Sequence, residues 1–206
     1  MQTADKDLRQ TPATIHSTFA VSLYAEKNFF RSAEALREQF EKQVLSSGGN
    51  RGLSAFVYAF RENSYQFLTS SADRIFTAGI LEEFIESLKA WAANTLGVSH
   101  VSAPQVRGYI HGCSRAFLCD EVSFEWHYSF CLTKRLCHHK TARIKLLVES
   151  IEEEQNRNFS IDRIVTLQPE LNDLVVHRAG NPYSIETGTK SMSPLEADIL
   201  LDGYLW

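Results

Sequence analysis

The stretch Trp126-His127-Tyr128-Ser129-Phe130-Cys131-Leu132-Thr133 is dominated by aromatic and apolar residues and contains neither glycine nor proline. A run of this kind is typical of a buried β-strand. Further strand-like segments, separated by turn residues, follow from Val101 onward: 105–110, 142–149, 161–167, 174–177 and 198–205. The second half of the chain therefore predicts many short strands.

The first half predicts two helices. Apolar residues recur at helical spacing over residues 28–45, with Asn28 in position to act as the N-cap. A second amphipathic helix is predicted over residues 78–96 and is closed by Gly97. Residues 1–14 form a polar terminus that we expect to be disordered. Residues 15–24 and 53–68 are strand-like. Helices followed by short strands favour a β-sandwich or barrel buttressed by helices.

The composition excludes several classes of function. The chain has 206 residues and a formal net charge of -4, so it lacks the excess of basic residues with which proteins bind nucleic acids or anionic membranes. Because no apolar run approaches the ~20 residues of a membrane span and the first residues do not resemble a signal peptide, we expect a cytoplasmic protein. The G-x-S-x-G, P-loop and G-x-G-x-x-G motifs are all absent from the sequence.

Four cysteines, Cys113, Cys119, Cys131 and Cys137, lie within 25 residues of one another. Their C-x5-C-x11-C-x5-C spacing contains no short C-x2-C pair of the kind that builds tight zinc sites. We therefore expect reduced thiols that pack as small apolar side chains.

Short motifs along the second half have a fixed order. They are Tyr109 to Gly112, Leu118-Cys119-Asp120, Trp126-His127-Tyr128 with Leu132-Thr133, Pro169 to Val175, Pro182-Tyr183-Ser184-Ile185, and Ser193 to Asp198 followed by Gly203. This order resembles the iron(II)/2-oxoglutarate-dependent oxygenases of the prolyl-hydroxylase-like branch. The resemblance implies an α+β fold, a double-stranded β-helix (jelly roll) buttressed by N-terminal helices. It also implies a single domain over 1–206, with helices and first strands in 15–100 and the jelly-roll core in 101–206.

The resemblance also implies which residues would carry the chemistry. Ferrous iron in that family is held by two histidines and one carboxylate, and a basic residue on a late strand pairs with oxoglutarate. The two histidine positions fall on Leu118 and Tyr183, and the carboxylate falls on Asp120. The basic residue is replaced by Asp198, which would repel a carboxylate. On this mapping one metal ligand of three remains, so we expect neither iron nor 2-oxoglutarate to be bound in the usual way.

Other residues are candidates for a rearranged metal site. His127 follows the carboxylate position by seven residues, and His177 lies on the predicted strand that leads to Tyr183. Together with Asp120 and Tyr183 they could surround a metal, although buried polar residues are often only hydrogen-bonded and His177 could simply pack. Lys190 could replace the lost positive charge, or it could be an ordinary surface lysine.

Three functions are consistent with these patterns. The favoured one is a pseudoenzyme: a non-catalytic, oxygenase-fold binding or partner subunit that forms a homo-oligomer or accompanies an active relative. The second is an atypical dioxygenase or other biosynthetic enzyme that uses a rearranged site in the same pocket, with iron(II) and 2-oxoglutarate as cofactors. The third is a plain cupin-like jelly roll that binds a small molecule or has a structural role.

Overall fold

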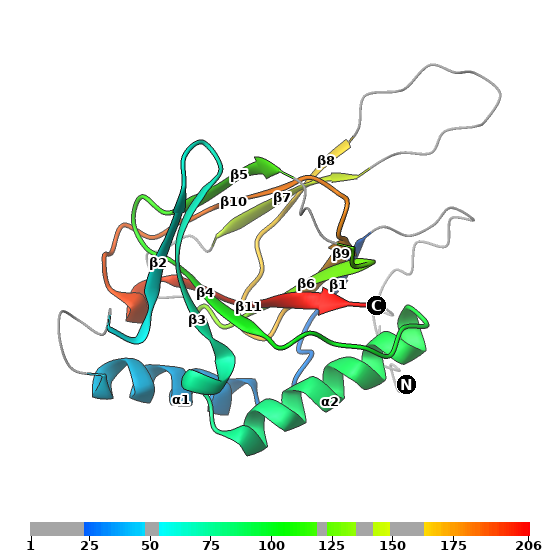
Figure 1. Ribbon diagram of the computed structural model, residues 1–206, viewed down its shortest axis with the longest axis horizontal. Helices are drawn as coiled ribbons and strands as arrows, with labels where there is room; N and C mark the ends of the chain where they lie inside the picture. Colours follow the sequence, from blue (N-terminus) through cyan, green and yellow to red (C-terminus); the bar gives the residue numbers. More distant parts are fainter. Residues whose placement is uncertain (1–22, 48–53, 119–122, 135–141, 149–162) are drawn as a thin grey trace, which may run out of the picture.

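The strand-forming second half of the chain folds into two facing layers of antiparallel strands (Figure 1). The computed structural model describes residues 23–47, 54–118, 123–134, 142–148 and 163–206. The strands of these layers are β4 (Gln105–Tyr109), β5 (Ser114–Leu118), β6 (Trp126–Cys131), β7 (Arg143–Val148), β8 (Arg163–Leu167), β9 (Leu174–Arg178), β10 (Tyr183–Glu186) and β11 (Asp198–Leu205).

One layer has the order β9-β6-β11-β4 and the other has the order β5-β10-β7-β8. The chain crosses between the layers after β4, β5, β6, β8, β9 and β10, and every pairing is antiparallel. This topology is a double-stranded β-helix, and the fold class predicted from the sequence is confirmed.

The first half adds strands to the edges of both layers. β3 (Tyr65–Ser71) joins the layers, because Leu68 to Ser71 pair with β4 while Tyr65 and Gln66 pair with β5. β2 (Val57–Arg61) forms a hairpin with β3, and β1 (Leu23–Glu26) pairs with β9.

Two α-helices, α1 (Ala33–Ser46) and α2 (Ala78–Thr95), cover the outer face of the β9-β6-β11-β4 layer (Figure 1). Successive strand side chains alternate between faces, so Phe130 on β6 points outward and meets Phe84 of α2 with ring centroids 4.9 Å apart. Short 3-10 turns follow β3 and precede β11, at Ala72–Arg74 and Pro194–Glu196. In the described part of the chain, no helix is long and apolar enough to cross a membrane.

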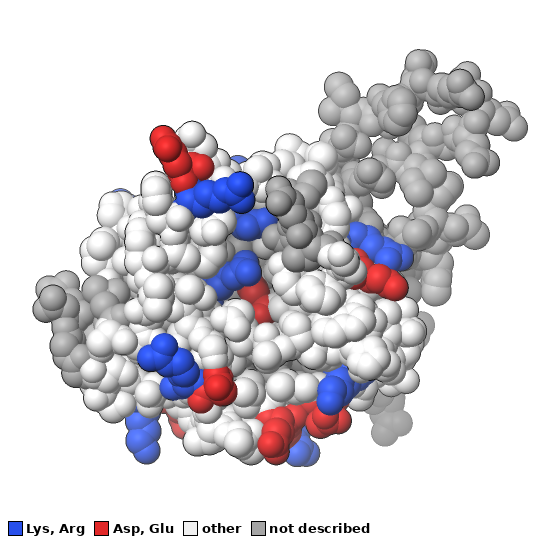
Figure 2. Space-filling view, viewed as in Figure 1, with Lys and Arg blue, Asp and Glu red and all other residues white. Residues whose placement is uncertain are grey.

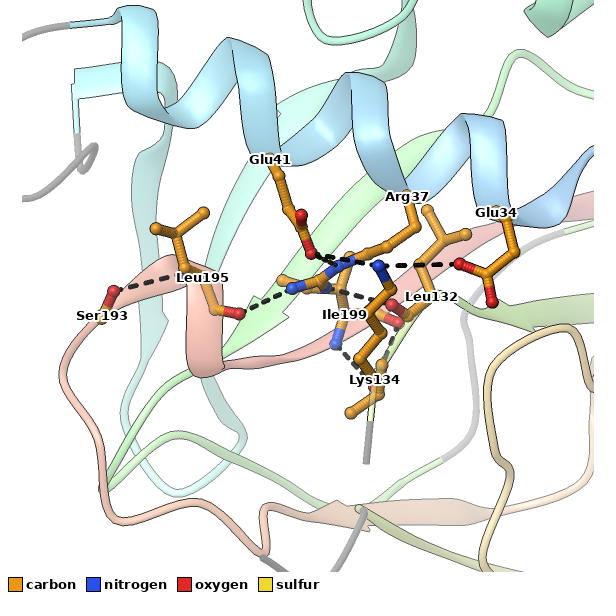
Figure 3. Close-up of polar contacts among 9 residues, drawn as sticks. Glu34, Arg37, Glu41, Leu132, Lys134, Ser193, Leu195 and Ile199 are labelled. Atoms are coloured by element: carbon orange, nitrogen blue, oxygen red, sulfur yellow. Dashed lines mark hydrogen bonds and ion pairs between the residues drawn. The ribbon is translucent and has the colours of Figure 1, made fainter. Parts of the chain in front are cut away.

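A buried arginine attaches α1 to the barrel (Figure 3). The Arg37 guanidinium donates hydrogen bonds to the carbonyl oxygens of Leu132 and Leu195, at 3.0 and 2.6 Å, and to the Glu41 carboxylate at 2.8 Å. Its side chain is almost completely buried, so these bonds compensate the desolvation of its charge. The helix therefore cannot slide along the sheet without breaking them.

The sequence located most of these elements. Every strand expected from Val101 onward is present within two residues of its predicted bounds, and α2 follows the predicted helix closely. β5 and β10 were not predicted as strands. The described part of the first predicted strand, over 15–24, begins at Leu23, and residues 1–14 lie outside the described residues.

The predicted helix cap at Asn28 is wrong. α1 begins at Ala33, with Ser32 at the N-cap position, and Asn28 adopts a left-handed conformation with φ 54°. The cause lies in Asn172, which precedes β9: its backbone oxygen accepts from the Phe29 N–H at 3.0 Å and its side-chain oxygen from the Phe30 N–H at 2.7 Å. Those two backbone groups are therefore committed to the barrel and do not start a helix.

Candidate active-site barrel

The strands that bury apolar side chains outside the barrel place polar ones inside it. Six polar side chains from six strands form the interior polar cluster: Arg107, Arg115, His127, His177, Tyr183 and Asp202. Tyr183 contacts three of the others: its ring lies 5.1 Å from that of His127, 4.8 Å from that of His177 and 4.1 Å from the guanidinium carbon of Arg115. Figure 2 shows basic and acidic side chains close together in a recess near the middle of the face viewed there.

His127 and His177 form a buried hydrogen-bonded pair. They are register partners on β6 and β9, and Nδ1 of His127 lies 3.1 Å from Nε2 of His177. Nδ1 of His177 lies 2.9 Å from the carbonyl oxygen of Arg178, which can only accept, so this nitrogen carries the proton. In a neutral pair, Nε2 of His177 then accepts the proton of His127 Nδ1.

This arrangement leaves Nε2 of His127 without a proton, so that it carries a lone pair inside the barrel. Nε2 is fully buried and has no hydrogen-bond partner among the described residues. Burial lowers the pKa of His127 well below its ordinary value, and the nearby His177, Arg107 and Arg115 lower it further. The imidazole is therefore neutral and presents a hydrogen-bond acceptor or a single metal-ligating nitrogen.

Arg107 and Asp202 form an ion pair deep in the barrel. Nη1 of Arg107 on β4 lies 3.2 Å from Oδ2 of Asp202 on β11, and the Asp202 side chain is completely buried. Burial alone would lower the pKa of Arg107, but the Asp202 carboxylate together with Tyr183, Tyr109 and Tyr204 outweighs burial, and the pKa is raised. The guanidinium also lies over the Phe67 ring at 5.1 Å. Arg107 is therefore charged in this ion pair.

The two positions that the resemblance assigns to histidine ligands are adjacent in space. Leu118 ends β5 and is the cross-strand partner of Tyr183, the first residue of β10. Leu118 is 37% exposed, whereas Tyr183 is fully buried in the interior polar cluster. The third position, Asp120, lies outside the described residues.

Asp198, which the resemblance assigns to the position of the oxoglutarate-binding cation, is hydrogen-bonded within the protein. Its carboxylate accepts hydrogen bonds from the Ala142 N–H, the Gly188 N–H and the Thr187 hydroxyl, at 3.0, 3.0 and 2.6 Å. Burial raises the pKa of Asp198, and these donors partly oppose the rise. The carboxylate thus ties the start of β7 to the end of β10. Lys190 is exposed.

Solved structures similar to this one are 2-oxoglutarate oxygenases. A prolyl-4-hydroxylase from Pseudomonas putida superposes with a TM-score of 0.61 and 13% identity, over 89% of this chain and 91% of the enzyme. The prolyl hydroxylase from Trichoplax adhaerens, in complex with a hypoxia inducible factor peptide, also gives 0.61 and 13%, over 90% and 83%. SnoN, a non-heme α-ketoglutarate-dependent epimerase of nogalamycin biosynthesis, gives 0.62 and 9%, over 88% and 75%.

The fold is that of the 2-oxoglutarate oxygenases. No protein-family model matches the chain, and no curated protein matches it in sequence. At 9 to 13% identity the likeness establishes the oxygenase fold, and the chemistry of the barrel must be argued from its own residues.

The two positions that the resemblance assigns to histidine ligands do not carry side chains suited to an iron site. Leu118 has no atom that can bind a metal, and Tyr183 offers a phenol in place of an imidazole. Across the described residues, no three His, Cys, Asp or Glu side chains lie close enough together to hold a metal ion. On the mapping that the resemblance implies, Asp198 takes the position of the basic residue that pairs with oxoglutarate.

Sequence reasoning identified both histidines and Tyr183 but missed Arg107, Arg115 and Asp202. A usable signal was present in the strand alternation. In β11, Asp202 occupies the same face as Asp198 within an otherwise apolar strand, and in β4 Arg107 alternates with buried Val106. A charged residue in such a strand indicates a polar barrel interior.

Proposed function

We propose that this chain is an oxygenase-fold protein that does not carry out iron- and 2-oxoglutarate-dependent oxidation and that acts as a non-catalytic binding or partner subunit. The observation that carries this proposal is the cross-strand pair of Leu118 and Tyr183. The resemblance assigns both histidine ligands of the iron to this register pair. In this chain the two positions carry the hydrocarbon side chain of Leu118 and the phenol of Tyr183.

The environment of Asp198 supports the same proposal. Three donors, from Ala142, Thr187 and Gly188, already occupy its carboxylate. A dicarboxylate placed against Asp198 would meet a like charge in a buried site, where repulsion is poorly screened. The cofactor of the oxygenase reaction therefore loses its anchor as well as its metal.

The experiment that tests this proposal attempts to rebuild the iron site. The double variant Leu118→His/Tyr183→His restores two imidazoles at the register pair and retains Asp120. We expect it to bind one Fe(II) per chain under anaerobic conditions, measured by calorimetry, while the wild type does not. The matched control is Phe117→His/Tyr183→His, because Phe117 is equally exposed, at 38%, but adjacent strand residues point to opposite faces. Stoichiometric Fe(II) binding by the wild type would overturn the proposal.

A second candidate is an atypical enzyme with a rearranged metal site, and the His127–His177 pair is the observation that favours it. Two ligands of one metal ion also lie about 3 Å apart, close to the 3.1 Å between these nitrogens. Asp120 and Tyr183 would complete such a site. If the wild type binds a metal and both His127→Ala and Asp120→Ala abolish binding without unfolding the protein, this candidate replaces the first.

A further inference from the structure

The β2–β3 hairpin carries an unusual concentration of exposed apolar side chains. Val57, Tyr58 and Phe60 on β2 are 60%, 54% and 63% exposed. β2 pairs with β3 along one edge, and no strand in the described part of the chain pairs with its other edge. An edge strand normally avoids association by carrying charges, a proline or a bulge. Between residues 57 and 60, β2 has none of these.

The sequence of β2 is complementary to itself when it runs antiparallel. If two copies pair about a twofold axis through Ala59, Tyr58 of each lies opposite Phe60 of the other, and Val57 lies opposite Arg61. Two cross-strand aromatic pairs result on one face, and these are among the more stabilising pairs in sheets. The single charge, Arg61, stays at the two ends. Parallel pairing in register would instead place Arg61 against Arg61.

We propose that the free edge of β2 is a self-association surface and that a second copy of this chain binds there, extending the sheet of each protomer across a twofold axis. A twofold interface buries the same patch on both copies, as the self-complementary strand requires. The inference is independent of the proposed function, because β2 contributes no residue to the interior polar cluster. Loss of the dimer and restoration of iron binding would therefore be separate results.

The first test uses the opposing positions 58 and 60. We expect the wild type to sediment at twice the mass of one chain. The variant Tyr58→Lys/Phe60→Lys places like charges opposite each other twice, and we expect the dissociation constant to rise about tenfold or more. The variant Tyr58→Lys/Phe60→Glu removes the same two aromatic side chains but places opposite charges together, and it should remain dimeric. Ile164→Lys, on the β8 edge strand and 58% exposed, is the control and should not change the mass.

The second test measures the position of the axis. Cysteines introduced by Ala59→Cys would face each other across the axis with Cα atoms about 4.5–5.5 Å apart, within reach of a disulfide. Val57→Cys places the two thiols about 13 Å apart along the strands, out of reach. In a background with Cys119→Ser and Cys137→Ser, we expect oxidation to cross-link the first variant only. A monomeric wild type, equal dissociation of the two charge variants, or equal cross-linking at both positions would each overturn the proposal.

Discussion

The two faces of the β9-β6-β11-β4 layer differ in chemistry although the same strands build both. On the outer face Phe130 and Leu201 pack under the helices, where burial of apolar area is the main source of stability. On the inner face His127 and Asp202 are equally buried but polar. A buried ion pair rarely stabilises a fold more than apolar side chains of the same volume would. The outer face therefore accounts for the fold, and the inner face is the part available for binding.

The largest effect should come from the outer face. Phe84 of α2 is fully buried and contacts Phe30 and Phe130. We expect Phe84→Ala to lower the free energy of unfolding by about 3–5 kcal/mol, because it removes an aromatic ring and leaves a cavity. Urea denaturation would measure the loss. Leu45→Ala, at a position 69% exposed, is the control and should change stability by less than about 0.5 kcal/mol.

A second pair of variants asks whether inner-face polarity is needed for stability. We expect Asp202→Ala to cost about 3 kcal/mol, because it leaves the Arg107 charge buried without its carboxylate. The double variant Arg107→Met/Asp202→Leu should recover most of that loss, since it removes both charges. If the double variant were as unstable as Asp202→Ala in the same urea measurement, the inner face would be a structural core like the outer one.

Gly203 offers a smaller test of how tightly the outer face is packed. A Cβ atom at this position would lie 2.5 Å from the Tyr128 hydroxyl oxygen and 2.7 Å from that of Ser102. We expect Gly203→Ala to cost about 1–3 kcal/mol, because the fully buried Tyr128 side chain must shift to admit a methyl group. Gly79→Ala, where the space is open, should not destabilise the protein in thermal unfolding. Equal effects at the two glycines would contradict this packing.

The smallest expected effect is the pH dependence that His127, on the inner face, gives to the free energy of unfolding. His127 stays neutral in the folded barrel because its pKa is lowered, whereas in the unfolded chain it gains a proton below about pH 6.5. The unfolded state then binds more protons, so stability should fall by up to about 1.4 kcal/mol per pH unit below 6.5 and be unaffected by this group above it. Unfolding free energies measured from pH 7 to 5 should show a smaller slope for His127→Gln. An unchanged slope would mean that His127 becomes charged in the barrel.

The sequence predicted the outer face better than the inner one. Runs rich in apolar residues located β6 and β11, because such runs are visible in the sequence itself. β5 and β10 were not predicted, and both are short and carry polar residues, Arg115 in β5 and Ser184 in β10. Local propensity also placed the helix start at Asn28, whereas a hydrogen bond that the Phe30 N–H donates to the side chain of Asn172, 142 positions away, decided it.

The contacts of the site were beyond sequence reasoning for the same reason. His127 and His177 are separated by 50 positions, and only the register of β6 against β9 brings their rings together. The role of Asp198 likewise depends on Ala142 and Thr187, which lie on other segments. The resemblance assigned Leu118 and Tyr183 to the two histidine positions, and in the structure these two residues are cross-strand partners on β5 and β10.

The most direct test of the central claim is an anaerobic calorimetric titration of the wild-type protein with Fe(II) and then with 2-oxoglutarate. Because Leu118 supplies no ligand and Asp198 opposes a carboxylate, we predict no stoichiometric heat from either addition. Binding of one Fe(II) and one 2-oxoglutarate per chain, followed by release of succinate when oxygen is admitted, would contradict the account.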